Sequence, residues 1–182
     1  MRTTISMRRK WYKRLFFTPK WSKLHMCYYL SLGSNLGNRE QTIHNALQRI
    51  KQRIGQISRC SSFYYSEPWG FESEHPFCNV CCCVCTAMKP IEVLRKTQTI
   101  EQELGRTAKS DPSCPQYKDR TIDIDIIRAF EDEGKEITMS DPLMRLTLPH
   151  PLWRERDFVR IPMEEIWNKT PVREQYESNT RF

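Results

Sequence analysis

The stretch Arg120–Ile127, with the sequence RTIDIDII, decides how the rest of the chain is interpreted. Apolar and acidic residues alternate along it. This alternation predicts a β-strand, because successive side chains of a strand point to opposite faces. The isoleucines at even positions are expected to face a core, which leaves Asp123 and Asp125 side by side on the other face. Two carboxylates at that spacing repel each other unless a cation lies close to both.

Two interpretations of this acidic pair stay open when the segment is taken alone. Mg²⁺ prefers oxygen ligands and is usually held by one or two carboxylates together with substrate phosphates. Arg120, just before the pair, would then be able to reach a phosphate bound by the same ion. In the alternative, the carboxylates are the solvated face of a strand whose other face is buried.

The distribution of charge argues against a body that binds a polyanion. The 182 residues include 29 Lys and Arg and 22 Asp and Glu, for a net charge of +7. Segment 1–26 holds eight of the basic residues and no acidic one, which leaves 21 basic against 22 acidic residues from Cys27 onward. The remainder is therefore close to neutral, and we expect no nucleic-acid partner for it.

The basic segment 1–26 is expected to be a disordered extension. Its longest apolar run, Leu15–Phe17, is too short for a signal-peptide core or a membrane span. Its composition also suits an organelle transit peptide, or an arm that touches anionic lipid or RNA. We expect one domain over 27–167, a polar tail over 168–182 and no stable membrane association.

Eight cysteines include the run CCCVC at 81–85. Cys78 with Cys81, and Cys82 with Cys85, have the spacing of metal-binding pairs. The segment is predicted to be a strand, in which residues three apart face opposite ways, so neither pair suits one ion. Cysteine is then interpreted as a small hydrophobic residue of a buried strand. Unpaired thiols favour a reducing compartment, and we expect a cytoplasmic protein.

The order of elements predicts an α+β fold. Strands are expected over 28–32, 57–66 and 77–88, followed by the acidic strand. Helices are expected from an Asn38 cap to Ile54, over 90–104 and near 154–166, and Ile137 is assigned to a short strand. Strand, helix, strand, strand, helix, strand is the split βαβ, or ferredoxin-like, arrangement: an antiparallel sheet of four or slightly more strands with helices packed on it.

Other motifs are modest when each is taken alone. Gly33–Gly37 (GSNLG) lacks the Lys and Ser or Thr of a P-loop, so a tight turn is the simpler interpretation. Gln98 and Glu101 share one face of a helix, and polar residues on an exposed helix face are the alternative interpretation. Arg106 suits the C-terminal end of its helix electrostatically. His150, between two prolines, is held in a loop and is more often structural than catalytic.

Together these motifs resemble the 6-hydroxymethyl-7,8-dihydropterin pyrophosphokinase family of folate biosynthesis. The matching segments are LGSNLG at 32–37, SSFYYSEPWG at 61–70, FCN at 77–79, QTIEQELGR at 98–106, RTIDID at 120–125, and LPHP at 148–151 followed by RDF at 156–158. The resemblance implies a ferredoxin-like fold and a transferase that moves pyrophosphate from ATP to the pterin hydroxymethyl group, releasing AMP. It also implies a monomer that has ATP and this pterin as partners.

The resemblance also implies roles for individual residues. Asp123 and Asp125 match the ligands of two Mg²⁺ ions held against ATP, and with Arg106 and Arg120 they form the implied catalytic set. The implied ATP-binding residues are Gln98, Glu101, Arg106, Lys109, Tyr117, Arg120, Ile126, His150 and Arg156. The implied pterin-binding residues are Ser66, Pro68, Trp69, Phe77, Asn79, Asp123 and Phe158, with Phe77 and Phe158 stacking on the ring.

Two departures and two alternatives accompany the resemblance. The loop 107–119 looks longer than in compact members, and Tyr117 stands where the family often has Trp. A ferredoxin-like RNA-binding module would need exposed sheet aromatics and basic residues on the domain, and the near-neutral domain argues against it. A non-catalytic pterin binder would not need the complete set of Asp, Arg and His positions.

Overall fold

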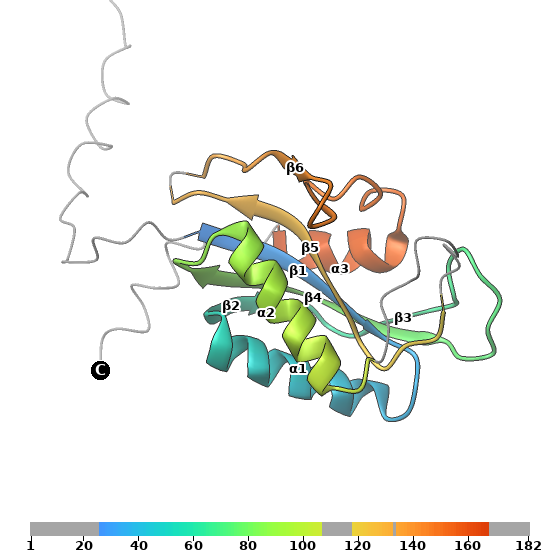
Figure 1. The fold of residues 1–182 in the computed structure, drawn as a ribbon. Helices are drawn as coiled ribbons and strands as arrows, with labels where there is room; N and C mark the ends of the chain where they lie inside the picture. Colours follow the sequence, from blue (N-terminus) through green and yellow to red (C-terminus); the bar gives the residue numbers. More distant parts are fainter. Residues whose placement is uncertain (1–25, 107–117, 133, 168–182) are drawn as a thin grey trace, which may run out of the picture.

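A computed structural model describes residues 26–106, 118–132 and 134–167. Within these ranges the elements follow the predicted order (Figure 1). They are β1 (Met26–Ser34), α1 (Arg39–Arg53), β2 (Gln56–Cys60), β3 (Tyr64–Ser66), β4 (Phe77–Thr86), α2 (Pro90–Glu103), β5 (Asp123–Phe130), β6 (Met139–Asp141), β7 (Leu146–Leu148) and α3 (Asp157–Trp167).

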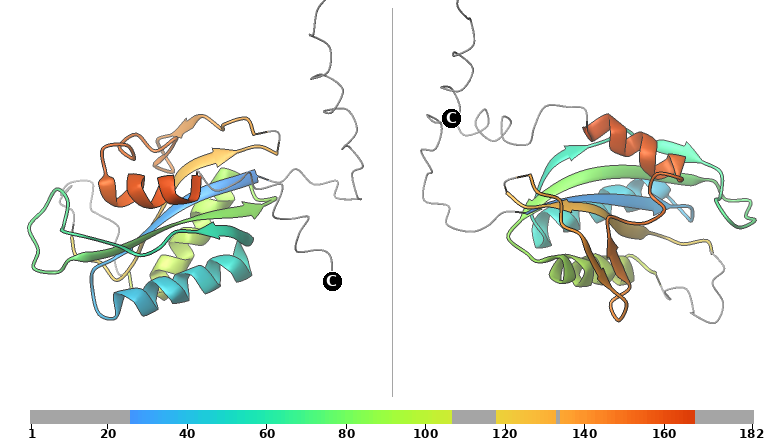
Figure 2. Two further views of the ribbon diagram at one scale, coloured as in Figure 1. Left: turned by 180° about the vertical axis from the view of Figure 1, so that it is seen from behind. Right: turned by 90° about the horizontal axis from the view of Figure 1, so that it is seen from above.

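The main sheet is antiparallel and has the strand order β2-β4-β1-β5, with β3 also paired to β4. Helices α1 and α2 lie on one face, whereas α3 packs on the other (Figures 1 and 2). The predicted α+β, split βαβ fold is confirmed. Strands β6 and β7 form a separate hairpin, and α3 gives the second face of the sheet a cover of its own.

Three predicted elements differ from the structure beyond a shift of two residues at an end. The strand expected over 57–66 is divided into β2 and β3, because Ser61 Oγ accepts the Cys81 backbone N–H and interrupts the ladder. Ile137 lies outside any strand, and the hairpin begins at Met139. The last helix begins at Asp157 rather than near Arg154, because residues 151–155 form turns after Pro149 and Pro151.

Alternation along the central strands divides the core between the two faces. Tyr28, Leu30 and Leu32 of β1 pack toward α1 and α2, while Tyr29 packs with residues of α3. Every residue of β4 is buried, and the described cysteines are all free thiols. The prediction that the CCCVC run belongs to a buried strand is confirmed, since a strand covered on both faces needs apolar side chains in both directions.

Leu30 offers a direct test of this core. It is 0% exposed at the centre of the sheet, whereas Leu143 in the β6–β7 turn is 96% exposed. We expect Leu30→Ala to lower the free energy of unfolding by about 2–5 kcal/mol, since it removes buried methyl groups and leaves a cavity. Leu143→Ala, the matched control, should change it by less than about 0.5 kcal/mol. Urea unfolding measures both, and equal effects would contradict the packing described.

Candidate active site

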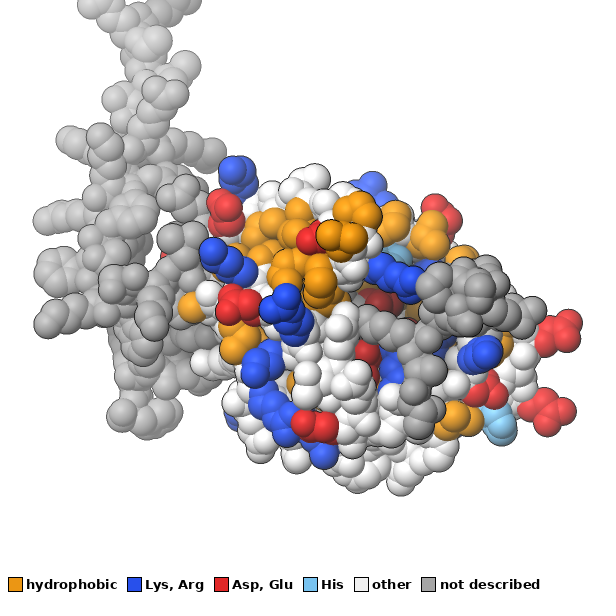
Figure 3. All heavy atoms as spheres, in the orientation of Figure 1, with side chains coloured by type: hydrophobic (Ala, Val, Ile, Leu, Met, Phe, Trp, Pro, Cys, Tyr) orange, Lys and Arg blue, Asp and Glu red, His pale blue; other side chains and the backbone are white. Residues whose placement is uncertain are grey.

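The acidic pair opens into a pocket at one end of the sheet. Asp123 and Asp125 lie opposite Gly33 and Ser31 of β1, while Ile124 between them is buried in the core. The four residues on this side of β1 and β5 line a cavity of ≈ 250 Å³. Figure 3 shows acidic and basic side chains next to one another in a hollow of the face that carries α2. The carboxylates therefore do not form an open, solvated strand face.

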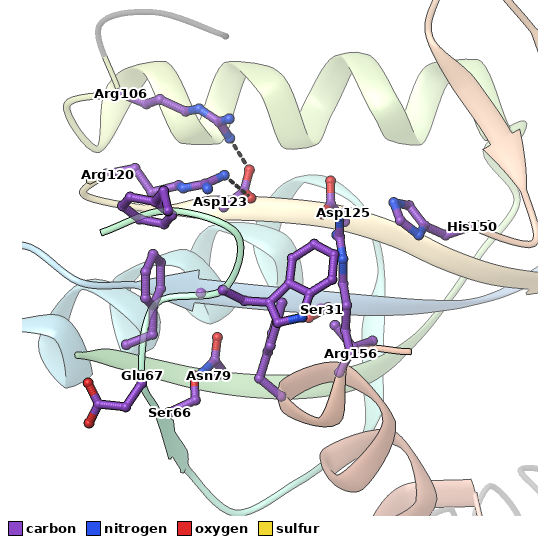
Figure 4. A pocket seen from close by; sticks show the side chains of 16 residues that line it. Ser31, Ser66, Glu67, Asn79, Arg106, Arg120, Asp123, Asp125, His150 and Arg156 are labelled. Carbon is purple, nitrogen blue, oxygen red and sulfur yellow. Dashed lines mark hydrogen bonds and ion pairs between the residues drawn. The ribbon is translucent and has the colours of Figure 1, made fainter. Parts of the chain in front are cut away.

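Two arginines neutralise Asp123 (Figure 4). Arg106, just after α2, donates to Asp123 Oδ1, and Arg120, just before β5, donates to Oδ2 at 2.5 Å. The three side chains are largely buried, so their ion pairs are screened less than surface pairs. The forked guanidinium donors are thereby held at the position where a phosphate would meet the carboxylates.

Glu101 holds Arg106 and β5 together. The residue is 3% exposed, and Oε1 accepts hydrogen bonds from the Ile124 backbone N–H at 2.7 Å and from Arg106. Burial raises the pKa of Glu101 to about 7, although the Arg106 charge opposes that rise. A carboxyl on the inner face of α2 thus links the helix to the acidic strand.

Asp125 has a different environment from Asp123. Asp125 is half-buried, and its carboxylate forms no ion pair with the described residues. Burial, followed by repulsion from Asp123, raises the pKa of Asp125 to about 6, while Arg156 is the first of the arginines that oppose the rise. The paired oxygens are the hard donors that Mg²⁺ prefers, so the two residues fit such an ion.

His150 faces Asp125 from the loop after β7 (Figure 4). Its backbone N–H donates to Ile127 O, and its Nδ1 accepts the Leu152 backbone N–H at 3.2 Å. Burial, together with the nearby Arg156 charge, lowers the pKa of His150 to about 4. The imidazole is consequently neutral at pH 7, with the proton on Nε2 because Nδ1 is an acceptor.

The other end of the pocket presents an oriented amide. Asn79 is 2% exposed, and its Nδ2 donates to Tyr64 O and to Ser66 Oγ, each at 3.1 Å. Gly33 lies directly opposite Asn79, and a Cβ built at Gly33 would lie 2.9 Å from Asn79 Oδ1. A larger residue at 33 would push the amide from its place, which gives this glycine a steric role.

Aromatic rings surround this amide. Phe77 packs edge-on against Phe71, with ring centroids 6.2 Å apart. The ring centroids of Trp69 and Phe158 are 6.4 Å apart. The Arg120 guanidinium lies 5.8 Å from the Phe77 centroid and that of Arg156 lies 4.8 Å from the Trp69 centroid. The pocket therefore joins an aromatic compartment, suited to a flat ring, to a cationic compartment suited to a polyphosphate.

Asn35 ties the turn after β1 to both flanking loops. Its Oδ1 accepts the Arg120 backbone N–H at 2.8 Å, and its Nδ2 donates to Asp119 at 2.6 Å and to His75 O at 3.2 Å. Gly37, with φ 63°, closes the turn. The turn interpretation of Gly33–Gly37 agrees with this geometry, since the segment positions the start of the acidic strand through a side-chain amide.

Most of the candidate residues inferred from sequence meet in this pocket. Those that line it are Ser66, Trp69, Phe77, Asn79, Arg106, Arg120, Asp123, Asp125, His150, Arg156 and Phe158. Glu101 and Ile126 line an adjoining cavity of ≈ 170 Å³ that shares Arg106, both aspartates and His150. Gln98 and Pro68 line neither cavity. Lys109 and Tyr117 lie outside the described residues.

Sequence reasoning did not select several lining residues. Ser31, Gly33, Phe71 and Val159 also face the main pocket, as does Glu67, to which no role had been given. The alternation of β1 would have indicated Ser31 and Gly33, because both share the face of the acidic pair once the register with β5 is known. Arg145 and Thr147, from the β6–β7 hairpin, line the adjoining cavity.

Paired carboxylates with two arginines beside an aromatic compartment, on a split βαβ sheet, define an enzyme of the phosphate-transferring class. The model of the 7,8-dihydro-6-hydroxymethylpterin-pyrophosphokinase (HPPK) family matches residues 29–168. The chain belongs to this family.

Relatives agree with this assignment. The 2-amino-4-hydroxy-6-hydroxymethyldihydropteridine pyrophosphokinase of Porphyromonas gingivalis is 44% identical over 138 residues, which are 76% of this chain and 88% of that protein. The enzyme of the same name from Bacillus subtilis is 36% identical over 139 residues, 76% of each chain. A crystal structure of Plasmodium falciparum HPPK-DHPS has a TM-score of 0.56 at 14% identity over 87% of this chain and 44% of that one, which supports the fold.

The part of the chain that the structure describes contains no helix long and apolar enough to cross a membrane.

The titration of His150 is a test of the site's electrostatics. We expect its imidazole to titrate near pH 4 in the folded protein, against 6.5 for an ordinary histidine, because burial and Arg156 disfavour the cation. The unfolded chain then binds more protons between these values, so this group lowers stability as the pH falls from 6.5 toward 4. NMR of the imidazole signals, assigned with His150→Asn, measures the midpoint. A midpoint near 6.5 would contradict the burial described.

Proposed function

We propose that the chain transfers the β,γ-pyrophosphate of ATP to the hydroxymethyl group of 6-hydroxymethyl-7,8-dihydropterin, giving the pterin diphosphate and AMP in folate biosynthesis. The observation that carries the proposal is the convergence, in one pocket, of the acidic pair, two arginines and an aromatic compartment with an oriented amide. Family membership supports the same reaction.

Asp123 and Asp125 would hold Mg²⁺, two ions being expected with ATP. The fit rests on two oxygen donors on one strand face, where burial and then repulsion from Asp123 raise the pKa of Asp125. Mg²⁺ supplies charge neutralisation and a fixed arrangement of phosphate oxygens when bound. Arg106 and Arg120 each carry five N–H donors, so they are placed to contact phosphate oxygens from beside the acidic pair.

Phosphate transfer requires positioning and charge neutralisation more than a covalent catalyst. Neutral His150 would donate Nε2–H to a phosphate oxygen, since its lowered pKa leaves the imidazole uncharged at pH 7. Asn79 would read the hydrogen-bonding edge of the pterin, with Phe77 and Phe158 on its faces. Arg156, which lies over Trp69, would connect the ring compartment to the phosphates.

The remaining features are part of the same proposal. Residues 26–167 would form the catalytic domain, one residue more than the sequence predicted because Met26 begins β1 and is buried in the core, with 1–25 and 168–182 outside it. The protein would act as a cytoplasmic monomer with ATP and the pterin as its partners, without nucleic acid and without stable membrane association. The free thiols of the described cysteines support a reducing compartment.

An AMP-release assay tests the reaction and its metal ligands. AMP should form only when Mg²⁺, ATP and the hydroxymethyl-dihydropterin are all present. Asp125→Asn and Asp123→Asn should lower kcat by more than ~100-fold, because even partners outside a ligand shell cost roughly 10–100-fold in metal affinity or activity. Asp125→Asn is the cleaner variant, since Asp123 also pairs with Arg106 and Arg120.

Asp132→Asn is the matched control, because Asp132 lies exposed in a turn and does not line the pocket. It should retain wild-type activity. AMP release that does not depend on the pterin would contradict the proposed reaction. Full activity in both pocket variants would contradict the assignment of Asp123 and Asp125 as metal ligands.

Gly33→Ala tests the pterin end separately. Its new Cβ would crowd Asn79 Oδ1, whose amide is held by Tyr64 and Ser66. Displacing the amide should raise KM for the pterin about 10-fold, the cost of roughly one buried hydrogen bond, and leave KM for ATP unchanged. Steady-state kinetics with each substrate varied in turn measures the two values. Equal increases in both would contradict the separation of the two compartments.

A further inference from the structure

A second cluster of chemically active side chains lies at the opposite end of the sheet. Cys27 of β1 and Cys85 of β4 are paired in register, and Cys83 lies two residues before Cys85, on the same face. The three Sγ atoms all lie within 4.8 Å of one another. The pocket begins at Ser31 of β1 and Asn79 of β4, each four residues along its strand from a cysteine of the cluster, or roughly 13 Å away.

The two CxxC pairs in the sequence do not correspond to this cluster. The pairs Cys78 with Cys81 and Cys82 with Cys85 are three residues apart and point to opposite faces, as expected for a strand. The third thiol here comes from another strand, so only the β1–β4 register brings it to the other two. The cluster therefore does not belong to the CxxC patterns considered from sequence.

The geometry of the three thiols suits one ion. A metal about 2.3 Å from each sulfur places the sulfurs about 3.8–4 Å apart, within the spread observed here. Cys27 Sγ and Cys85 Sγ are 2.9 Å apart, which is longer than a disulfide bond of about 2.05 Å, and all three cysteines are free thiols. Small rotations about the Cα–Cβ bonds would bring the sulfurs to equal separation.

Burial and charge select the kind of ion. Cys83 and Cys85 are buried, while Cys27 is half-buried and leaves a route from solvent. Arg59 of β2 is paired in register with Cys83 and is itself buried, with Nη1 donating to Ile166 O at 2.8 Å. Three thiolates with a divalent ion carry one net negative charge, which the Arg59 guanidinium offsets. A monovalent ion would leave a second negative charge in a buried place.

We propose that Cys27, Cys83 and Cys85 form a binding site for a soft divalent cation of the Zn²⁺ class, separate from the Mg²⁺ site of the proposed function. Sulfur ligands favour such ions over Mg²⁺. Among the described residues no histidine or carboxylate completes the cluster, so the fourth coordination position is open to water. Binding deprotonates the thiols and releases their protons to the buffer.

Zn²⁺ alone, added to the reduced full-length chain in excess Mg²⁺, tests the site. Elemental analysis and competition with a chromophoric chelator should give one tightly bound Zn²⁺ per chain, and Zn²⁺ should raise the midpoint of thermal unfolding. Zn²⁺ should also protect Cys27, the half-buried thiol of the cluster, from alkylation, as measured by mass spectrometry of digests. Exposed Cys60, which is outside the cluster, should react equally with and without the metal.

Matched serine variants locate the ion. Cys27→Ser should lose the stoichiometric Zn²⁺ and its thermal shift, whereas Cys60→Ser should keep both, and both variants should keep the AMP-release activity measured without Zn²⁺. Cys27 is only half-buried, so this variant leaves the interior of β4 intact. Zn²⁺ retained by Cys27→Ser, or absent from the reduced wild-type chain, would overturn the proposal. A chain that binds no Zn²⁺ when reduced, and forms a Cys27–Cys85 disulfide when exposed to air, would overturn the proposal in favour of a redox pair.

Discussion

The ion pairs of Asp123 are the interaction on which the site depends. A carboxylate two residues from another on one strand face is unfavourable unless cations lie close to both. Arg106 reaches Asp123 from the end of α2 and Arg120 from the approach to β5, so the acidic strand is joined to two neighbouring segments. Glu101 completes this arrangement by holding Arg106 and the Ile124 N–H together. The same side chains therefore balance the charge of the acidic strand and hold α2 against it.

Charge balance also explains why the two aspartates differ. Both carboxylate oxygens of Asp123 accept hydrogen bonds from arginines. Asp125, in contrast, is half-buried beside the Asp123 charge and has a raised pKa. The same burial, with the positive charge of Arg156, keeps His150 neutral. A cation that reaches this pocket therefore finds an oxygen donor that pairs with no guanidinium of the described residues, and a neutral N–H donor nearby. This asymmetry is compatible with the proposed binding of ATP together with Mg²⁺.

Local pattern was sufficient for the fold, whereas the resemblance to a family was needed to select most residues of the pocket. Alternation in RTIDIDII predicts β5 and its two faces, and caps such as Asn38 predict where helices begin. What local pattern could not provide was register. Ser31 and Gly33 face the acidic pair only because β1 and β5 pair in one particular alignment, and Ser61 interrupts a strand through a bond to distant Cys81. Glu101 was placed correctly on α2, yet its contact with the Ile124 N–H depends on how the helix docks.

Register also explains why one sheet can carry two kinds of donor without conflict. β1 presents Gly33 and Ser31 to the aspartates of β5 at one end, and Cys27 to the thiols of β4 at the other. Oxygen donors beside arginines suit Mg²⁺ with phosphate, while sulfur donors beside Arg59 suit a softer ion. Tyr29, Cys81 and the apolar residues of α3 fill the same face between the two ends and keep it dry. The packing of α3 therefore separates the two sets of donors, and an ion bound at the thiols would act on the pocket only through the rigid strands between them.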